Sequence, residues 1–187
     1  MHESGLYQRI LGDEWRHLDG AIQRLHTPGK GVHATGPFRV IHGRYGTARL
    51  LARLLRLPAE AENVEARLHV EPAGSAELWS RTFDGCPLVT RQTGAASGIL
   101  TENVGRLELQ FRLSVRNGAM IYQSLRAGLR IGSRSMPLPT WIAPIVAASE
   151  KPSARTGCVS ISVIVSLPRI GLLLSYAGEV ETQESET

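Results

Sequence analysis

From residue 64 onward, apolar and polar residues alternate along one short segment after another, and this alternation constrains the fold more than any other feature. In VEARLHVE, residues 64–71, every second residue is apolar and the residues between them are charged or polar. RLELQFRLSV repeats the pattern, and its apolar face is formed by Leu107, Leu109, Phe111, Leu113 and Val115. A period of two is typical of a β-strand that buries one face. The sequence therefore predicts strands that each turn one apolar side toward an interior.

Turn residues separate the predicted strands so closely that neighbouring strands must run antiparallel. Asn117-Gly118 is a strong signal for a two-residue hairpin, and PAGS at 72–75 and PRIG at 168–171 are further turns. The other strand candidates are ELWSRTF, CPLVTRQ, GILTENV, AMIYQSLRAGLRI, CVSISVIVSLP and IGLLLSYAGEVE. About eight to ten consecutive strands joined by such turns build a meander. We therefore expect a mainly β (α+β) fold, either an antiparallel up-and-down β-barrel or a strongly curved meander sheet.

Two helical patterns precede the strands. In SGLYQRILGDEWRHLDGAIQRLH, apolar residues recur at spacings of three and four, and we expect a break near Gly12 with N-caps at Asp13 and Asp19. After the short strand-like FRVIH, the segment ARLLARLLRL is expected to form a helix that Thr47 caps and Pro58 ends. Its apolar face is predicted to meet the core through Leu50, Leu51, Leu54 and Leu55.

We expect the N-terminal helices to cover one end of the barrel or sheet, because no long helix follows the strands. The sequence contains no internal repeat and no linker, which predicts a single domain over residues 1–187. The helical part is predicted at 4–57, the β-barrel or sheet at 62–181, and a polar tail at 182–187.

Composition and charge argue against several classes of partner. The net charge is +4, but 19 of the 21 basic residues are arginines scattered along the chain, and only 5% of residues are aromatic. We interpret the stripe of Arg49, Arg53 and Arg56 as a solvated helix face, with contact to nucleic acid or an anionic membrane as the alternatives. No apolar run approaches the roughly 20 residues that cross a bilayer, and MHESGLYQRI lacks the apolar segment of a signal peptide. We predict no nucleic-acid partner, no integral membrane association, a cytoplasmic location, and a monomer or homodimer.

Motifs for metal, nucleotide or covalent chemistry are absent from the sequence. Cys86 and Cys158 are far apart and are interpreted as small thiols rather than a disulfide or a metal site. The histidines lack the spacing of zinc ligands, and no GxSxG elbow is present. HGRYGTARLL fits neither nucleotide-binding glycine motif, so we interpret it as a turn before a capped helix rather than a phosphate site. We therefore predict no metal and no cofactor.

Five segments occur in an order that resembles the bacterial domain of unknown function 4166 family. They are LYQRILGDEWRHLDGAIQRLH, ARLLARLLRLP, WSRTFDG, MPLPTWIAP and SLPRIGLLLSYAGEVE, and together they extend over nearly the whole chain. The resemblance implies no established activity. Some members are attached to dinucleotide-dependent oxidoreductase domains, which implies a metabolic setting and a possible oxidoreductase partner.

The segment MPLPTWIAP, residues 136–144, is unusual for a connection between strands because it is stiff and apolar. Proline fixes φ and cannot join a strand ladder, so we predict a rigid flap that presents Trp141 and Ile142 to the rest of the domain. The flap either packs on the core or closes a cavity. Directly after it, Glu150 follows the apolar run IVAAS and is a candidate general acid or base, with an exposed loop end as the alternative.

If the sheet closes into a barrel, one strand face lines a cavity, and either the apolar or the polar face is a candidate for this lining. If it does not close, the apolar face packs on the helices and the polar face meets water. An apolar lining would include Trp79 and Phe111, with Tyr122 and Tyr176 as rare polar groups. From this pattern we predict binding of a hydrophobic small molecule by a cofactor-free cyclase- or isomerase-type enzyme of bacterial secondary metabolism. Glu150, Tyr122 and Tyr176 are the catalytic candidates, and Trp79, Phe111, Trp141 and Ile142 are the candidates for substrate binding. The alternative is a non-catalytic module that binds a lipid or small molecule, or that assists a dinucleotide-dependent oxidoreductase.

Overall fold

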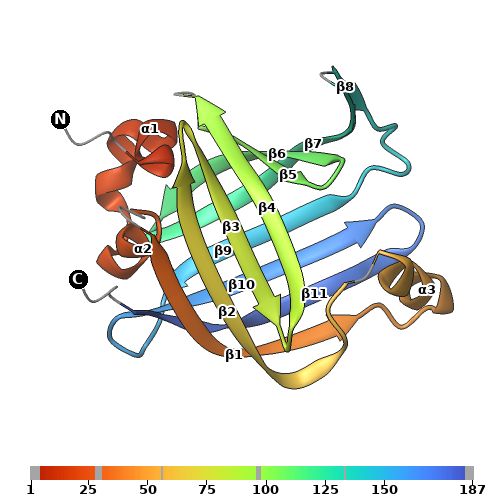
Figure 1. Ribbon diagram of the computed structural model, residues 1–187, viewed down its shortest axis with the longest axis horizontal. Helices are drawn as coiled ribbons and strands as arrows, with labels where there is room; N and C mark the ends of the chain where they lie inside the picture. The colour runs from red at the N-terminus through yellow and green to blue at the C-terminus, as the bar shows by residue number, and fades with distance from the viewer. Residues whose placement is uncertain (1–4, 28–30, 56, 96–97, 133, 184–187) are drawn as a thin grey trace.

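In the computed structural model, ten antiparallel strands close into a barrel with helices at its two ends (Figure 1). The structure describes residues 5–27, 31–55, 57–95, 98–132 and 134–183. The ten strands are β1 (Val32–His42), β2 (Ala61–Ala73), β3 (Ala76–Phe83), β4 (Cys86–Ala95), β5 (Ile99–Val104), β6 (Leu107–Arg116), β7 (Ala119–Ile131), β9 (Ile145–Pro152), β10 (Cys158–Leu167) and β11 (Gly171–Gln183). The short strand β8 (Arg134–Pro137) pairs only with the end of β7.

Each strand pairs with the next around the barrel, and the ring closes where β1 pairs with β11. Of the two fold alternatives, the closed up-and-down barrel is therefore confirmed. The hairpin predicted at Asn117-Gly118 joins β6 to β7, and both residues have positive φ angles of 50° and 78°. Such angles match the twist of the flanking strands in a two-residue hairpin. The turn at 168–171 likewise joins β10 to β11.

The first strand is longer than the sequence pattern suggested. FRVIH is only the second half of β1, whose 11 residues pair with β2 on one side and β11 on the other. The polar and small residues at its start obscure the alternation, and a register irregularity between Phe38 and Val40 breaks it again. This strand is a member of the barrel wall although it lies within the segment predicted to be helical.

The N-terminal segment forms α1 (Leu6–Leu11), a 3-10 helix η1 (Gly12–His17) and α2 (Gly20–Leu25), which together cover one end of the barrel (Figure 1). The predicted break at Gly12 is confirmed, since its φ of 56° ends α1. Asp19 caps α2 by accepting a hydrogen bond from the Ala21 amide at 2.8 Å. The predicted cap at Asp13 is wrong, because this residue lies inside η1 and pairs with Arg16.

The helix α3 (Gly46–Leu54) lies at the opposite end of the barrel, between β1 and β2, and its orientation differs from the prediction. Its buried residues are Ala48 and Ala52, whereas Leu50 and Leu54 are 59% and 70% exposed. The two alanines let the helix approach β11 closely, while the leucine side turns outward. Thr47 does not cap the helix, since Tyr45 occupies the N-cap position without a side-chain bond. Within the described residues, no helix combines the length and apolar character required to cross a bilayer.

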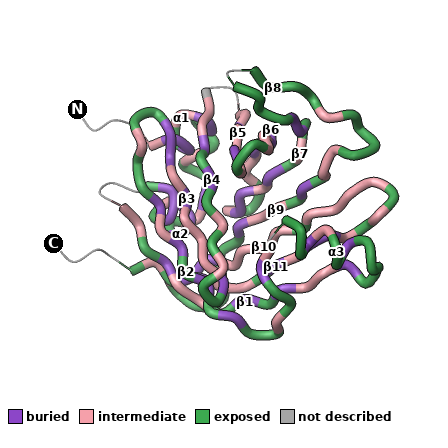
Figure 2. The backbone as a smooth tube through the Cα atoms, turned by 45° about the vertical axis from the view of Figure 1, so that its right-hand side comes forward, coloured by how far each residue is buried: buried purple, intermediate pink, exposed green. Residues whose placement is uncertain are grey.

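The apolar face of the strands points into the barrel, as the tube in Figure 2 indicates by the regular change between buried and less buried residues. Along β2, for example, Val64, Ala66, Leu68 and Val70 are buried and the residues between them are largely exposed. The interior nearest α1 and α2 is filled by their apolar side chains, including Leu6, Ile22 and Leu25. Cys158 at the start of β10 is buried, and Cys86 at the start of β4 is half-buried.

Closure of the ring depends on Gly178, which lies in β11 against Phe38 of β1. A Cβ atom at this position would lie 2.2 Å from the Pro37 carbonyl oxygen and 2.6 Å from the Phe38 ring. We expect Gly178→Ala to lower the free energy of unfolding by about 1–3 kcal/mol or more, because the two strands must separate to admit the methyl group. Urea denaturation measures this change.

Gly46→Ala is the matched control, because no atom lies within 4 Å of a Cβ at that position. It starts α3, where alanine is the better helix former. Equal stability of the two variants would show that the contact between β1 and β11 is not as tight as described.

Candidate functional site

A cavity of about 450 Å³ occupies the part of the barrel that the N-terminal helices leave open. Its wall is largely apolar and includes Leu68, Leu88, Leu109, Phe111, Val146 and Val163. Exposed residues such as Leu55 and Ile142 also line it, so the cavity reaches the end of the barrel that bears α3. Ligand pockets of drug-sized molecules have this size and this apolar character.

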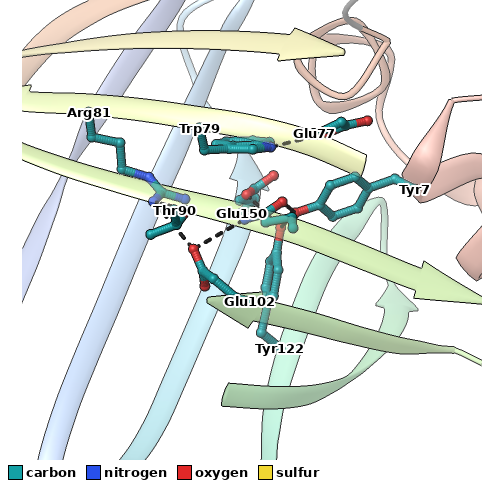
Figure 3. A network of polar contacts seen from close by, with 9 residues as sticks. Tyr7, Glu77, Trp79, Arg81, Thr90, Glu102, Tyr122 and Glu150 are labelled. Carbon is teal, nitrogen blue, oxygen red and sulfur yellow. Dashed lines mark hydrogen bonds and ion pairs between the residues drawn. The ribbon is translucent and has the colours of Figure 1, made fainter. Parts of the chain in front are cut away.

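Polar side chains gather at the inner end of the cavity, beside α1 and α2 (Figure 3). Glu150 on β9 is only 6% exposed and receives a hydrogen bond from the Tyr122 hydroxyl at 2.8 Å. Its other oxygen lies 2.5 Å from Nε2 of the fully buried His26, which follows α2. The pair of Glu150 and Tyr122 belongs to the cavity lining, whereas His26 lies behind it. The cavity therefore ends on a carboxyl group that two neighbours hold in place.

The hydrogen bonds continue from Tyr122 across the inner end of the cavity, beside α1 and α2, which is called the floor of the barrel below. The hydroxyl oxygens of Tyr122 and Tyr7 are 3.4 Å apart, and the Tyr7 hydroxyl donates to Gln92 Oε1 at 2.6 Å. Gln92 Nε2 in turn donates to Glu102 Oε1 at 3.3 Å. These contacts join Tyr7 of α1 to three strands that are remote from it in sequence (Figure 3).

Arg81 places a positive charge at the same floor. Its Nη1 donates to the Thr90 hydroxyl at 3.1 Å and to Glu102 at 3.4 Å, and its guanidinium lies 5.1 Å from the Trp79 ring centroid. Burial is the largest effect and lowers the pKa of Arg81, but the attraction of Glu102, together with smaller contributions from the nearby tyrosines, outweighs it and raises the pKa. Nε and Nη2 form no hydrogen bond with the described residues, and Arg81 lines the cavity. These N–H groups can therefore receive an oxygen atom of a ligand.

The tyrosines of the floor are hydrogen-bond donors at neutral pH. Burial, followed by the charge of Glu150, raises the pKa of Tyr7 and of Tyr122 well above the ordinary value. Burial also raises the pKa of Tyr176, against the effect of Arg81. The Tyr176 hydroxyl makes no hydrogen bond with the described residues although the side chain lines the cavity. It is therefore available to a ligand.

Behind the floor, between the barrel and the helices, lies a second buried carboxyl group. Glu77 is 2% exposed and accepts a hydrogen bond from Trp79 Nε1 at 3.1 Å, while its Oε1 has no partner in the described part of the chain. The His26 ring lies between those of Tyr7 and Trp79, tilted to both, with ring centroids 3.8 and 5.1 Å away, and its Nδ1 likewise has no partner there. Burial raises the pKa of Glu77.

The structure brings together most of the residues that the sequence singled out. Glu150, Tyr122, Tyr176, Trp79, Phe111 and Ile142 all line the cavity. The alternative placement of Glu150 at an exposed loop end is wrong, because it lies inside β9 and is buried. Trp141 lies elsewhere: it neither caps the core nor lines the cavity, and its side chain is 57% exposed.

Sequence reasoning missed Arg81, Glu102, Gln92, Tyr7 and His26. A signal for the first was present, since Arg81 follows Trp79 by two residues and so shares its strand face. A signal of the same kind was present for Glu102, which lies two residues from each of the inward-facing Leu100 and Val104. No local pattern marks Tyr7 or His26, because their position depends on how the N-terminal segment packs against the barrel.

Metal ligands are not gathered anywhere in residues 5–27, 31–55, 57–95, 98–132 and 134–183, since no group of three His, Cys, Asp or Glu side chains there could hold an ion.

Comparison with known proteins assigns the family. The model of the domain of unknown function DUF4166 matches residues 18–180, and the chain belongs to this family. A search of curated proteins found no match.

The buried Glu77 gives the stability a pH dependence that Glu77→Gln should remove. The pKa of Glu77 in the folded state lies above its value in the unfolded state, so the native protein binds the carboxyl proton more tightly. Wild-type stability therefore falls as the pH rises from the unfolded pKa to the folded pKa. Glu77→Gln has no charge to bury and still offers an oxygen to Trp79. We expect the variant to match the wild type below the unfolded pKa and to be more stable at neutral pH. Urea unfolding at a series of pH values measures the difference, and a variant less stable at every pH would contradict this account.

Proposed function

We propose that the chain binds an apolar small molecule in the barrel cavity and acts on it as a cofactor-free cyclase- or isomerase-type enzyme of bacterial secondary metabolism. The observation that supports this proposal is a single one: an apolar cavity of about 450 Å³ that ends on the hydrogen-bonded pair of Glu150 and Tyr122. An apolar wall excludes water from a reacting molecule, and a buried carboxyl group is a suitable proton carrier.

In this proposal the ligand enters with an oxygen-bearing end first. The unused N–H groups of Arg81 and the Tyr176 hydroxyl would donate to that oxygen, while the apolar body lies against residues such as Leu109 and Val163. A carbonyl or carboxylate fits these donors, because all of them offer protons and Arg81 also offers a positive charge. The ligand class is therefore an apolar molecule with one carbonyl or carboxylate end.

The proposed chemistry is the movement of one proton. The Glu150 carboxylate would take a proton from the carbon next to the ligand carbonyl, and the electron pair of the broken C–H bond would move onto the carbonyl oxygen. Arg81 or Tyr176 would stabilise that negative charge by hydrogen bonding. For an isomerisation, Glu150 would then return the proton to another carbon as the electron pair moves back from the oxygen, which shifts a double bond. For a cyclisation, the deprotonated carbon would instead form a bond to an electron-poor double-bond carbon of the same ligand, and Glu150 would return the proton to the carbon that receives the displaced electron pair. Neither route needs an oxidant or reductant.

The hydrogen bonds around Glu150 accommodate both of its protonation states. When it is ionised, the Tyr122 hydroxyl donates to it at 2.8 Å. When it is protonated, Glu150 can donate to Tyr122, whose own proton can turn toward the Tyr7 oxygen 3.4 Å away. The Tyr122 hydroxyl would therefore reorient when Glu150 gains or loses its proton, and the hydrogen bond between the two groups would be kept in both states.

The second candidate function is a non-catalytic module that carries a lipid or small molecule, or that assists a dinucleotide-dependent oxidoreductase. One observation favours it: both carboxyl groups that line the cavity already have protein partners, Glu150 in Tyr122 and His26, and Glu102 in Arg81 and Gln92. A floor of paired groups is suited to holding a ligand unchanged.

Filling the cavity tests the binding common to both candidates. Val163 lines the cavity, whereas its neighbour Ile164 on β10 is exposed on the outer wall. We expect Val163→Trp to reduce the binding of an apolar fluorescent dye at least tenfold, because the indole occupies the space of the ligand. Ile164→Trp is the matched control and should bind the dye as the wild type does. If both variants bind the dye normally, the cavity is not the binding site.

The variant Glu150→Gln distinguishes an enzyme from a non-catalytic ligand carrier. The change keeps the shape and the hydrogen bond from Tyr122 but cannot carry the proton, so dye binding and the melting temperature should change little. In a strain that lacks the gene, we expect the product of the enzyme to disappear from cell extracts, as measured by mass spectrometry. The wild-type gene should restore this product, and the Glu150→Gln gene should not. Restoration by Glu150→Gln would favour the carrier, and an unchanged profile without the gene would contradict the enzyme.

A further inference from the structure

The end of the barrel that bears α3 exposes a ring of large apolar side chains. Ten of the thirteen exposed large apolar residues in the described part of the chain lie in two segments, 45–55 and 129–145. We define the apolar rim as Leu50, Leu54, Ile131, Met136, Trp141 and Ile145. Both segments also contribute to the cavity lining, for instance through Leu55 and Ile142, so the rim flanks the mouth of the cavity. Apolar patches at one site of a surface usually mark a site of interaction.

Four of the six rim residues lie on α3, β8 and the connection from β8 to β9, which Figures 1 and 2 show at the same end of the molecule. Ile131 and Ile145 are the residues of β7 and β9 that adjoin β8 and this connection. In α3, Ala48 and Ala52 face the barrel, so Leu50 and Leu54 point away from it beside Arg49 and Arg53. A helix with leucines and arginines on its outer side is suited to an interface between apolar and polar surroundings. Within the described chain, nothing covers these leucines.

The same end carries positive charge and few carboxyl groups. Segments 43–59, 130–149 and 163–178 contain no Asp or Glu. Their exposed arginines that form no salt bridge in the described part of the chain are Arg44, Arg49, Arg53, Arg130, Arg134 and Arg169. The carboxyl groups that directly adjoin these segments are Glu60, Glu150 and Glu179. Glu150 is buried at the inner end of the cavity, and Glu179 accepts a hydrogen bond from Ser153. An occupant of this surface must therefore be apolar and negatively charged together.

We propose that the apolar rim docks on an anionic phospholipid bilayer, with the mouth of the cavity facing the lipid. Leu50 and Leu54 enter the boundary of the acyl chains, and Arg49 and Arg53 contact phosphate groups. Trp141, whose ring lies 6.0 Å from the Arg169 guanidinium carbon, takes the headgroup level that exposed tryptophans favour at membranes.

This docking gives the proposed ligand a direct route. An apolar molecule dissolves in the bilayer rather than in water, so a mouth in contact with lipid lets it reach the cavity without crossing water. Only this step depends on the proposed function, because the docking itself needs no ligand.

Co-sedimentation with vesicles tests the docking on the full chain. We expect the protein to bind vesicles of phosphatidylcholine with phosphatidylglycerol, more weakly at high salt, and hardly to bind phosphatidylcholine alone. Leu50→Gln with Leu54→Gln should weaken the binding roughly tenfold or more, and so should Arg49→Glu with Arg53→Glu. These side chains are exposed, so the melting temperature should remain near that of the wild type.

The control pair is Val89→Gln with Leu125→Gln, because both residues are exposed and lie outside the two rim segments and the three segments that lack Asp and Glu. It should leave vesicle binding unchanged. Trp141 supplies an independent readout: its fluorescence should shift to the blue with anionic vesicles, and Trp141→Phe should lose that shift.

Three results would overturn the proposal. The first is an absence of binding to anionic vesicles at low salt, and the second is equal weakening by the rim and control pairs. The third is a dimer that Leu50→Gln with Leu54→Gln dissociates while vesicles are not bound, since this would assign the rim to a second copy of the chain. Dye binding in the cavity is measured without vesicles, so failure of the docking and failure of the proposed function are distinguishable.

Discussion

The backbone pairing of β1 with β11 holds the barrel closed and so determines where the cavity and its polar groups lie. It joins the first strand to the last and turns a meander into a ring, so the apolar strand faces enclose an interior instead of covering a flat core. The pairing requires close backbone approach, and Gly178 permits it. The closed barrel has two ends that differ in how they are covered. One is filled by α1 and α2, and the other remains open beside α3.

The filled end supplies chemistry as well as packing. Tyr7 and His26 come from the N-terminal segment, and they reach Gln92 and Glu150 on opposite parts of the barrel wall. The polar floor therefore exists only when this segment is docked. Burial also keeps the tyrosines protonated, which makes the floor a set of defined donors facing an apolar space. The same arrangement that stabilises the barrel thus prepares a site for a molecule with one polar end.

The sequence predicted what depends on local pattern and missed what depends on packing. Alternation and the Asn117-Gly118 turn were sufficient for an antiparallel meander, but they left a closed barrel and a curved sheet as alternatives. The strand face of Trp79 and Phe111 was sufficient for much of the lining. The outward direction of Leu50 was not predictable, because small alanines on the other side of α3 determine which face docks. Residues as far apart in sequence as Tyr7, Glu102 and Glu150 come together only through closure of the ring.

We propose that the barrel interior, rather than its outer surface, holds an apolar molecule. Intermolecular NOE measurements test it most directly, using methyl-labelled protein and an unlabelled medium-chain fatty acid as the probe. We expect contacts from the acyl chain to the methyl groups of Leu109 and Val163 inside the barrel. Contacts confined to exposed methyl groups such as those of Leu50, Leu54 or Ile164, with none inside, would contradict it.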